Sequence, residues 1–153
     1  SRTVALAVNS LIVRDADVVS RVPLETFFAT QTIGVRINGT QPFGVIRRSV
    51  GLLDESGHAD AAQALRRRGD EVRSRLDQGL GDPDALIRAR ADAARLAVDA
   101  ASALVAAGGG PALIRGSHAE RLVREAAFTL VAASRPALKD LLVHQFSGVE
   151  DSS

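Results

Sequence analysis

Cysteine, methionine, tryptophan and tyrosine are all missing from this chain of 153 residues. Without cysteine the chain can form no disulfide bond, no thiolate metal site and no thiol nucleophile. The same absence fits a reducing compartment, and we expect a cytoplasmic location. Methionine is missing even at position 1, so a chain that begins at Ser1 is expected to be a processed product, a separate domain or a fragment.

Aromatic residues are scarce, and all of them are phenylalanine, at 3% of the chain. A core with so few rings must be built from leucine, valine, isoleucine and alanine. Alanine side chains let neighbouring helices approach closely, because the distance between helix axes depends on the side chains at the contact. The composition therefore favours closely packed helices.

An excess of charge of one sign is also lacking, since 19 basic residues face 18 acidic ones. No net field is expected to steer the chain toward nucleic acid or anionic lipid. The basic triplet Arg66–Arg68 is followed by Asp70 and Glu71, which is typical of a solvated helix face. The longest apolar stretch, at 100–107, is too short to cross a bilayer. We therefore expect no nucleic-acid partner and no membrane span.

The first part of the chain differs in pattern from the rest. Residues 3–8 and 11–13 are short runs rich in β-branched side chains, separated by Asn9 and Ser10, which predicts two short strands. Two strands alone are only marginally stable, so residues 1–23 are expected to end a larger β-domain. Residues 24–37 are predicted to be a connection with one helical turn near 24–29, because Gly34 and Gly39 interrupt a longer helix.

From residue 40 onward the apolar residues repeat with helical spacing. We predict helices over about 40–54, 59–78, 83–107 and 117–133, and a last helical stretch from Pro136 to about 146. Asp82 with Pro83, and Ser117 with Glu120, are helix-start signals. The expected buried stripes are Phe43, Ile46, Val50 and Leu53; Ala61, Leu65, Val72 and Leu76; and Leu86, Ala89, Ala93, Leu96, Ala97, Ala100 and Leu104. Arg88, Arg90, Asp92, Arg95 and Asp99 are expected off the third stripe.

The predicted fold class is therefore mainly α. Residues 38–146 are expected to form an antiparallel up-and-down four-helix bundle, preceded by short strands left over from a β-domain. The tail at 147–153 is expected to be frayed.

Few residues outside the helix pattern suggest chemistry by themselves. His58, His118 and His144 are far apart in sequence, and a metal site needs convergent ligands, so we expect no metal. Gly108, Gly109 and Gly110 match neither a phosphate-binding loop, which needs a following lysine, nor the dinucleotide fingerprint, which needs a preceding strand. Their pattern is typical of a helix end followed by a turn.

Three features in a fixed order give a resemblance to a known family. An alanine-rich helix from Leu96 leads to Gly108–Gly110, and the step Arg124-Glu125-Ala126 then precedes the segment 131–136. This order resembles the C-terminal helical domain of acyl-CoA dehydrogenases, with residues 1–23 in place of the last strands of the middle β-domain. These FAD-dependent enzymes oxidise acyl-CoA thioesters to 2-enoyl-CoA, and the helical domain forms the oligomer core.

The resemblance also assigns roles to particular positions. Gly109 and Gly110 match a Gly-Gly pair that packs beside the adenosine half of FAD, across a subunit interface. A glutamine usually stands three residues earlier, where this chain has Ala106. The usual position of the catalytic glutamate falls on Ala133, and its alternative position lies near Asn38 to Gln41.

Neither of these two positions holds a carboxylate, and none occurs between Glu25 and Asp54. The reaction requires a base that removes the proton alpha to the thioester, and such a base typically contributes about 10²–10⁴-fold. The resemblance therefore implies no catalytic residue in this chain and no dehydrogenation by the chain alone.

Three functions remain open at this point. The chain is the C-terminal part of an acyl-CoA dehydrogenase-like flavoprotein, a non-catalytic subunit that completes a partner's flavin site, or a free-standing helical association domain. The first two imply a homo-oligomer or a heteromeric complex, and an acyl-CoA substrate in the full protein. We expect the isolated chain to bind no FAD, and to self-associate through the helices at 83–107 and 117–133.

Overall fold

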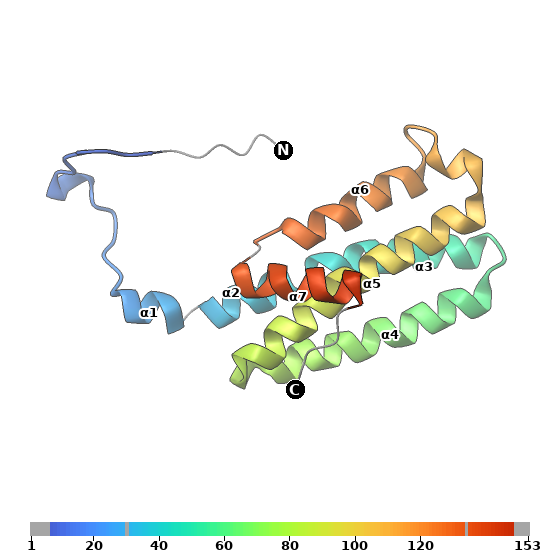
Figure 1. Ribbon diagram of the computed structural model, residues 1–153, viewed down its shortest axis with the longest axis horizontal. Helices are drawn as coiled ribbons and strands as arrows, with labels where there is room; N and C mark the ends of the chain where they lie inside the picture. The colour runs from blue at the N-terminus through green and yellow to red at the C-terminus, as the bar shows by residue number, and fades with distance from the viewer. Residues whose placement is uncertain (1–6, 30, 134, 149–153) are drawn as a thin grey trace.

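The computed structural model describes residues 7–29, 31–133 and 135–148, and this part of the chain is mainly helical (Figure 1). The α-helices are α1 (Leu24–Ala29), α2 (Gln31–Asn38), α3 (Gln41–Glu55), α4 (Ala59–Gln78), α5 (Pro83–Gly108), α6 (His118–Val131) and α7 (Pro136–Ser147). There are also short 3-10 turns: η1 (Asp15–Asp17) before α1, η2 (Gly79–Gly81) between α4 and α5, and η3 (Gly110–Leu113) between α5 and α6.

The strands expected over 1–23 are not found in residues 7–23, and residues 1–6 lie outside the described part. Residues 7–23 instead form an irregular segment with one 3-10 turn, η1, and ion pairs from Arg14 to Asp17 and from Arg21 to Asp15. A strand needs a neighbour for its backbone N–H and C=O groups. No other segment of the described chain is a strand that could pair with this one.

The expected connection at 24–37 is wrong beyond its first turn. The helical turn near 24–29 is present as α1, but the residues after it form a second helix, α2. Gly34 does not stop α2, and Gly39 marks its end at a close contact: a Cβ there would lie 2.9 Å from Leu76 Cδ2 on α4. Arg36 of α2 also pairs with Asp77 of α4. Contacts with α4 and α5 stabilise a segment that local propensity leaves undecided.

The later helices confirm the periodicity within the usual uncertainty of helix ends. Asp82 Oδ1 accepts hydrogen bonds from the backbone N–H groups of Asp84 and Ala85, both at 3.0 Å, with Pro83 at the first position of α5. Ser117 Oγ accepts one from the N–H of Glu120 at 3.1 Å at the start of α6. Side-chain caps therefore begin α5 and α6 where the sequence places them.

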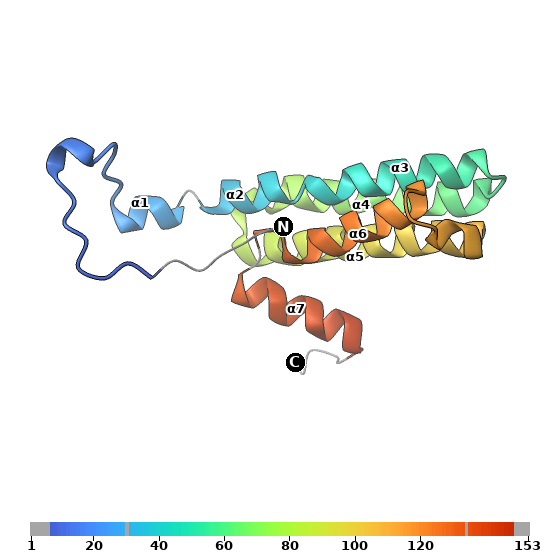
Figure 2. The same cartoon turned by 90° about the horizontal axis from the view of Figure 1, so that it is seen from above.

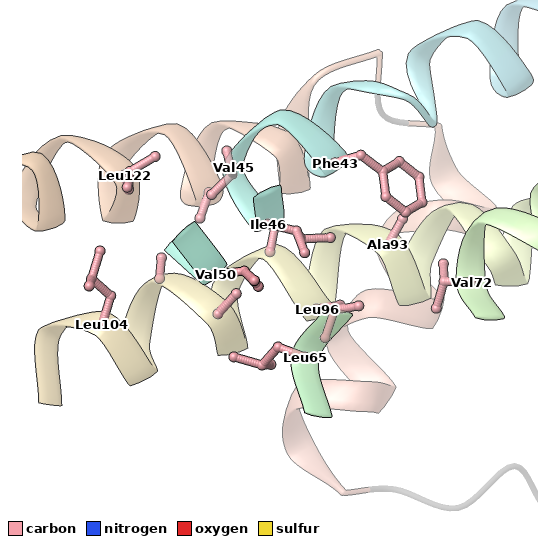
Figure 3. Packing of buried hydrophobic residues seen from close by; sticks show 14 of the residues in the cluster. Phe43, Val45, Ile46, Val50, Leu65, Val72, Ala93, Leu96, Leu104 and Leu122 are labelled. Carbon is pink, nitrogen blue, oxygen red and sulfur yellow. The ribbon is translucent and has the colours of Figure 1, made fainter. Parts of the chain in front are cut away.

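Helices α3, α4, α5 and α6 lie side by side and run in alternating directions (Figures 1 and 2). Helix α5 is the central element, since it contacts α2, α3, α4, α6 and α7. Figure 3 shows how leucine, valine and isoleucine side chains of α3, α4, α5 and α6 meet between the helices, with Phe43 at one edge. All residues of the stripes expected for 40–54 and 83–107 are buried.

The stripe expected on α4 needs one correction. Ala62, and not Ala61, is buried, together with Leu65, Val72 and Leu76. Gly69 completes this stripe, and a Cβ there would lie 3.6 Å from Ile46 Cγ2. Gly69 is thus the buried residue between Leu65 and Val72, at a place where an added methyl group would make an ordinary contact with α3.

Helix α5 is buried on more than one face. Ala91 and Ala94, outside its main stripe, pack with Leu138 and Leu142 of α7 in a second apolar cluster. The expectation that Arg90 lies off the buried surface is wrong, because this side chain is only 2% exposed. Helices α6 and α7 cover the face of α5 that a single-stripe interpretation leaves to solvent.

The end of the described chain is held by polar contacts. Gln145 Nε2 donates to Asp92 Oδ1 at 2.8 Å, and Arg95 Nη1 donates to the Gln145 carbonyl oxygen at 2.8 Å. Helix α7 reaches Ser147, so the expected fraying begins no earlier than Gly148, and 149–153 lie outside the described residues. Within the described residues, no helix has both the length and the apolar character needed to cross a membrane.

Candidate functional site

A cavity of about 300 Å³ lies where α2, α5 and α7 meet the link between α6 and α7. This volume is at the lower end of the range for small-molecule sites. Apolar side chains from three helices form part of the wall, and two arginines supply positive charge. The lining residues are Gly34, Val35, Asn38, Ile87, Arg90, Ala133, Arg135 and Leu138.

The family resemblance assigns the catalytic base to Ala133 or to the stretch near Asn38 to Gln41, and of these residues Ala133 and Asn38 line this one cavity. Ala133 comes from the link after α6, and Asn38 is the last residue of α2, so most of the chain separates them. Asn38 Nδ2 donates to the Gly34 carbonyl oxygen at 2.9 Å, and its Oδ1 accepts from Gln41 Nε2 at 3.3 Å. The structure therefore brings the two positions together, with an amide at one and a methyl group at the other.

The backbone at Ala133 is in the left-handed region, with φ of 49°. Non-glycine residues seldom adopt this conformation, and holding one there costs on the order of 1–3 kcal/mol. The link is short, because α6 ends at Val131 and α7 begins at Pro136. This tight reversal places the exposed Ala133 at the cavity.

Arg90 is the principal polar side chain of the cavity. Its Nη2 donates to the Thr129 carbonyl oxygen at 2.8 Å and more weakly to that of Ala132 at 3.4 Å, near the end of α6. Its Nη1 is buried and has no hydrogen-bond partner among the described residues. Burial lowers the pKa of the Arg90 guanidinium from its usual value. An arginine this buried is uncommon unless its charge is paired.

The charge around the cavity is of one sign. Arg135 also lines it, is partly buried, and makes no ion pair within the described part of the chain. None of the lining residues is acidic. Leu138 lies in the first turn of α7, where backbone N–H groups have no helical acceptor. The arrangement suits a negatively charged group and offers no carboxylate for proton abstraction.

Gly109 and Gly110, the cofactor-binding pair implied by the resemblance, lie at the other end of α5 and do not line this cavity. Gly109 caps α5 with φ of 59° and ψ of −151°, a conformation almost restricted to glycine. A Cβ added at either residue would meet nothing within 4 Å. Their open backbone fits the approach of a flat ring such as adenine, but only as one wall of a site.

Gly108, the first residue of the triplet, is explained by packing inside the chain. A Cβ at Gly108 would lie 2.9 Å from the Cβ of Ala112 in η3. Close packing inside the chain therefore accounts for Gly108, and helix termination accounts for Gly109. Gly110 is the member of the triplet for which neither contact nor backbone conformation explains the choice of glycine.

Arg124 and Glu125, which carry part of the resemblance, do not pair with each other. Arg124 Nε lies 2.6 Å from Glu120 Oε1, and Arg121 Nε lies 3.5 Å from Glu125 Oε1. Both pairs join residues one helical turn apart, as expected for a helix surface. The hydrogen bond from Arg124 lowers the pKa of the partly buried Glu120.

The histidines lie at separate places. His58 precedes α4, with its Nδ1 3.3 Å from Ser56 Oγ; His118 begins α6; and His144 is on α7. The described residues contain no group of three or more histidine, cysteine or acidic side chains that could hold a metal ion.

Sequence reasoning missed Arg90 and Arg135 as site residues. One signal for Arg90 was available, since it stands between two alanines, Ala89 and Ala91, on an alanine-rich helix. No such signal exists for Arg135, whose position depends on how α7 packs.

Comparisons with known proteins give no family assignment: no family model matches the chain, and no match is found among curated proteins or solved structures.

Proposed function

We propose that this chain is the C-terminal helical domain of an acyl-CoA dehydrogenase-like flavoprotein, in a subunit that does not itself supply the catalytic base. One observation carries the proposal. The resemblance gives two alternative locations for the base, and Ala133 and Asn38, one residue from each location, line a single cavity although they are distant in sequence. Composition and periodicity do not single out either of these positions, so their meeting at one cavity does not follow from the helix pattern.

The helix arrangement also supports this proposal. Helices α3, α4, α5 and α6 alternate in direction and share one core, as in an up-and-down four-helix bundle. Residues 7–23 leave this body as an irregular segment with many exposed apolar side chains, including Val13 and Val19. In the proposed protein these apolar side chains pack against the rest of a β-domain.

The chemistry of the cavity favours a non-catalytic subunit. Dehydrogenation requires a carboxylate near the alpha carbon, and this cavity presents Arg90, Arg135 and an amide instead. FAD, when bound in such a protein, accepts the hydride. This chain would contribute the open backbone at Gly109 and Gly110 to one side of the adenosine half.

The proposal is tested on the protein expressed from its complete reading frame, alone and with a co-expressed partner subunit. We expect a flavin absorbance band, and acyl-CoA turnover only in the presence of the partner. Absence of flavin from both preparations would contradict the proposal. Turnover by this protein alone would contradict the non-catalytic assignment.

A substitution provides a sharper test of the cavity. Ala133→Glu places a carboxylate at the family position, and we expect measurable turnover by the flavin-loaded full-length protein without a partner. Ala137→Glu is the matched control, because Ala137 is also exposed and does not line the cavity. Equal activity of the two variants would count against the assigned position.

A second candidate function, helical association, is favoured by an exposed apolar surface on α6 and α7. A groove there is lined mainly by apolar residues: Leu130, Val131, Lys139, Leu142, Val143, Phe146 and Ser147. Helix α5 contributes little to the surface because its neighbours cover it. Self-association, if it occurs, is therefore expected through α6 and α7. Light scattering on wild type and Val131→Glu tests this, with Val19→Glu as the exposed control.

A further inference from the structure

We propose that the cavity between α2, α5 and α7 binds a small carboxylate with a short apolar chain, and that Arg90 and Arg135 hold the carboxylate. The proposal does not depend on the proposed function, because it follows from the charge, burial and volume of the cavity. It would hold equally for an association domain.

The first line of support is the unused hydrogen-bonding capacity of Arg90. Its Nη2 is occupied by the Thr129 carbonyl oxygen, whereas the buried Nη1 has no partner within the described residues. An unsatisfied buried donor on a charged group is costly, and an anion in the adjoining cavity would remove that cost. Arg90 also lines the cavity, so its side chain borders the space that an anion would occupy.

The second line of support is the surrounding charge. Arg135 adds another guanidinium, and no acidic side chain lines the cavity to neutralise the pair. The N-terminal end of α7 also lies at this place, since Leu138 in its first turn lines the cavity, and the helix dipole favours negative charge there. These features favour an anion, and the fork of a guanidinium matches the two oxygens of a carboxylate.

The third line of support is the apolar wall and the small volume of the cavity, which indicate what the ligand carries besides its carboxylate. Val35, Ile87 and Leu138 supply apolar walls, and the volume of about 300 Å³ admits only a small molecule. An inorganic anion such as phosphate would leave these walls without contact. A carboxylate with a chain of a few carbons would satisfy both parts of the cavity.

Hexanoate is the probe, and calorimetry on the 153-residue chain measures its dissociation constant. We expect a value on the order of 0.1–1 mM, since few atoms make contact. Hexanamide has a similar shape without the charge and is expected to bind at least about tenfold more weakly, whereas phosphate tests the anion without the chain. No hexanoate binding, or equal or tighter binding of hexanamide or phosphate, would overturn the proposal.

Gly34→Leu tests the location without removing any hydrogen bond of Arg90. A Cβ at Gly34 meets nothing within 4 Å, so the variant is expected to fold with its side chain occupying part of the cavity. Gly44→Leu is the matched control: Gly44 is helical and equally open, but exposed and outside the cavity. We expect about tenfold weaker binding or more for Gly34→Leu only. Unchanged affinity in Gly34→Leu would overturn the location.

Arg135→Gln tests the charge at a position that is not fully buried, so folding is expected to be retained. Loss of one charge-assisted contact should weaken hexanoate binding about tenfold and leave hexanamide binding unchanged. Arg88→Gln, an exposed arginine on α5 outside the cavity, is the control. An equal effect of both variants, or none from Arg135→Gln, would overturn the role of Arg135.

Discussion

The two ends of helix α5 differ in how far local sequence rules explain their structure. At the cavity end, where Gly34, Arg90 and Ala133 meet, a buried cation keeps an unused donor and a non-glycine residue has a positive φ. At the glycine end, around Gly108–Gly110 and Ser117, every unusual conformation belongs to a glycine and the helix start is capped. The difference indicates that local rules account for the glycine end, whereas the cavity end keeps features that local stability does not explain.

The largest expected effect is a loss of stability at the cavity end of α5, and it tests whether this end is as tightly packed as the rest of the core. Leu86, one residue before the cavity-lining Ile87, is 1% exposed. We expect Leu86→Ala to lower the free energy of unfolding by about 2–5 kcal/mol, as for other buried leucines. Urea unfolding followed by circular dichroism measures it, with the half-exposed Leu80→Ala as control. A loss below about 1 kcal/mol would show that this end is loosely packed.

The next effect concerns the backbone at the glycine end. Gly109→Ala forces a methyl-bearing residue into φ of 59° and ψ of −151°, which should cost about 1–3 kcal/mol. Gly110→Ala should stay within about 0.5 kcal/mol, because a Cβ there meets nothing. Thermal unfolding of the two variants compares them directly. Equal stability would remove the structural explanation of Gly109 and leave ligand approach as its reason.

Removing a helix cap by substitution with alanine allows the two ends of α5 to be compared, because Asp82 lies near one end and Ser117 near the other. Asp82→Ala removes the cap at the start of α5, and Ser117→Ala removes the cap at the start of α6. Each is expected to cost about 1 kcal/mol in free energy of unfolding. Ser117 Oγ also donates to the Ala112 carbonyl oxygen at 2.7 Å, so its loss is expected to be the larger of the two. The reverse order in chemical unfolding would contradict this ranking.

The smallest effect is the pH dependence of the pair between Glu120 and Arg124. The pKa of Glu120 is lowered by Arg124 in the folded chain, so the pair adds stability above the usual value of 4.5. That contribution disappears as pH falls through the lowered folded pKa. Wild type and Glu120→Gln should therefore differ slightly in stability at neutral pH and converge in acid. Because Arg124 is exposed and the expected effect is small, a double-mutant cycle with Arg124→Gln is the suitable measurement. A difference that grows in acid would contradict the sign.

Local sequence signals predicted the five main helical stretches and the side-chain caps of two of them, at Asp82 and Ser117, because proline, aspartate and serine act within a few residues of themselves. The glycine signal was correct at Gly39, where α2 ends, but Gly34 lies inside α2 and does not interrupt it. The helix at 31–38 was missed because it depends on contacts with distant residues, such as the ion pair from Arg36 to Asp77. Of the strands expected over 1–23, none is found within residues 7–23, since strand pairing depends on a neighbour that the described chain lacks.

The site was less predictable than the fold. The resemblance named Ala133 and, as an alternative, the stretch near Asn38 to Gln41, but nothing in the sequence states that α2 and the α6–α7 link share a cavity. Periodicity assigned Arg90 to the surface because a single stripe was counted on α5. A helix covered by neighbours on several faces buries residues that a single-stripe pattern assigns to solvent.

The sequence alone determined the mainly helical class, the positions of the main helices and the absence of a carboxylate at both candidate base positions. These are properties of composition and of near neighbours, so they are independent of how the helices meet. Only the tertiary structure decided that Arg90 is buried with an unused donor, and that Gly34, Asn38 and Ala133 surround it. Burial and convergence depend on contacts between distant segments, and the packing of α6 and α7 across α5 creates them.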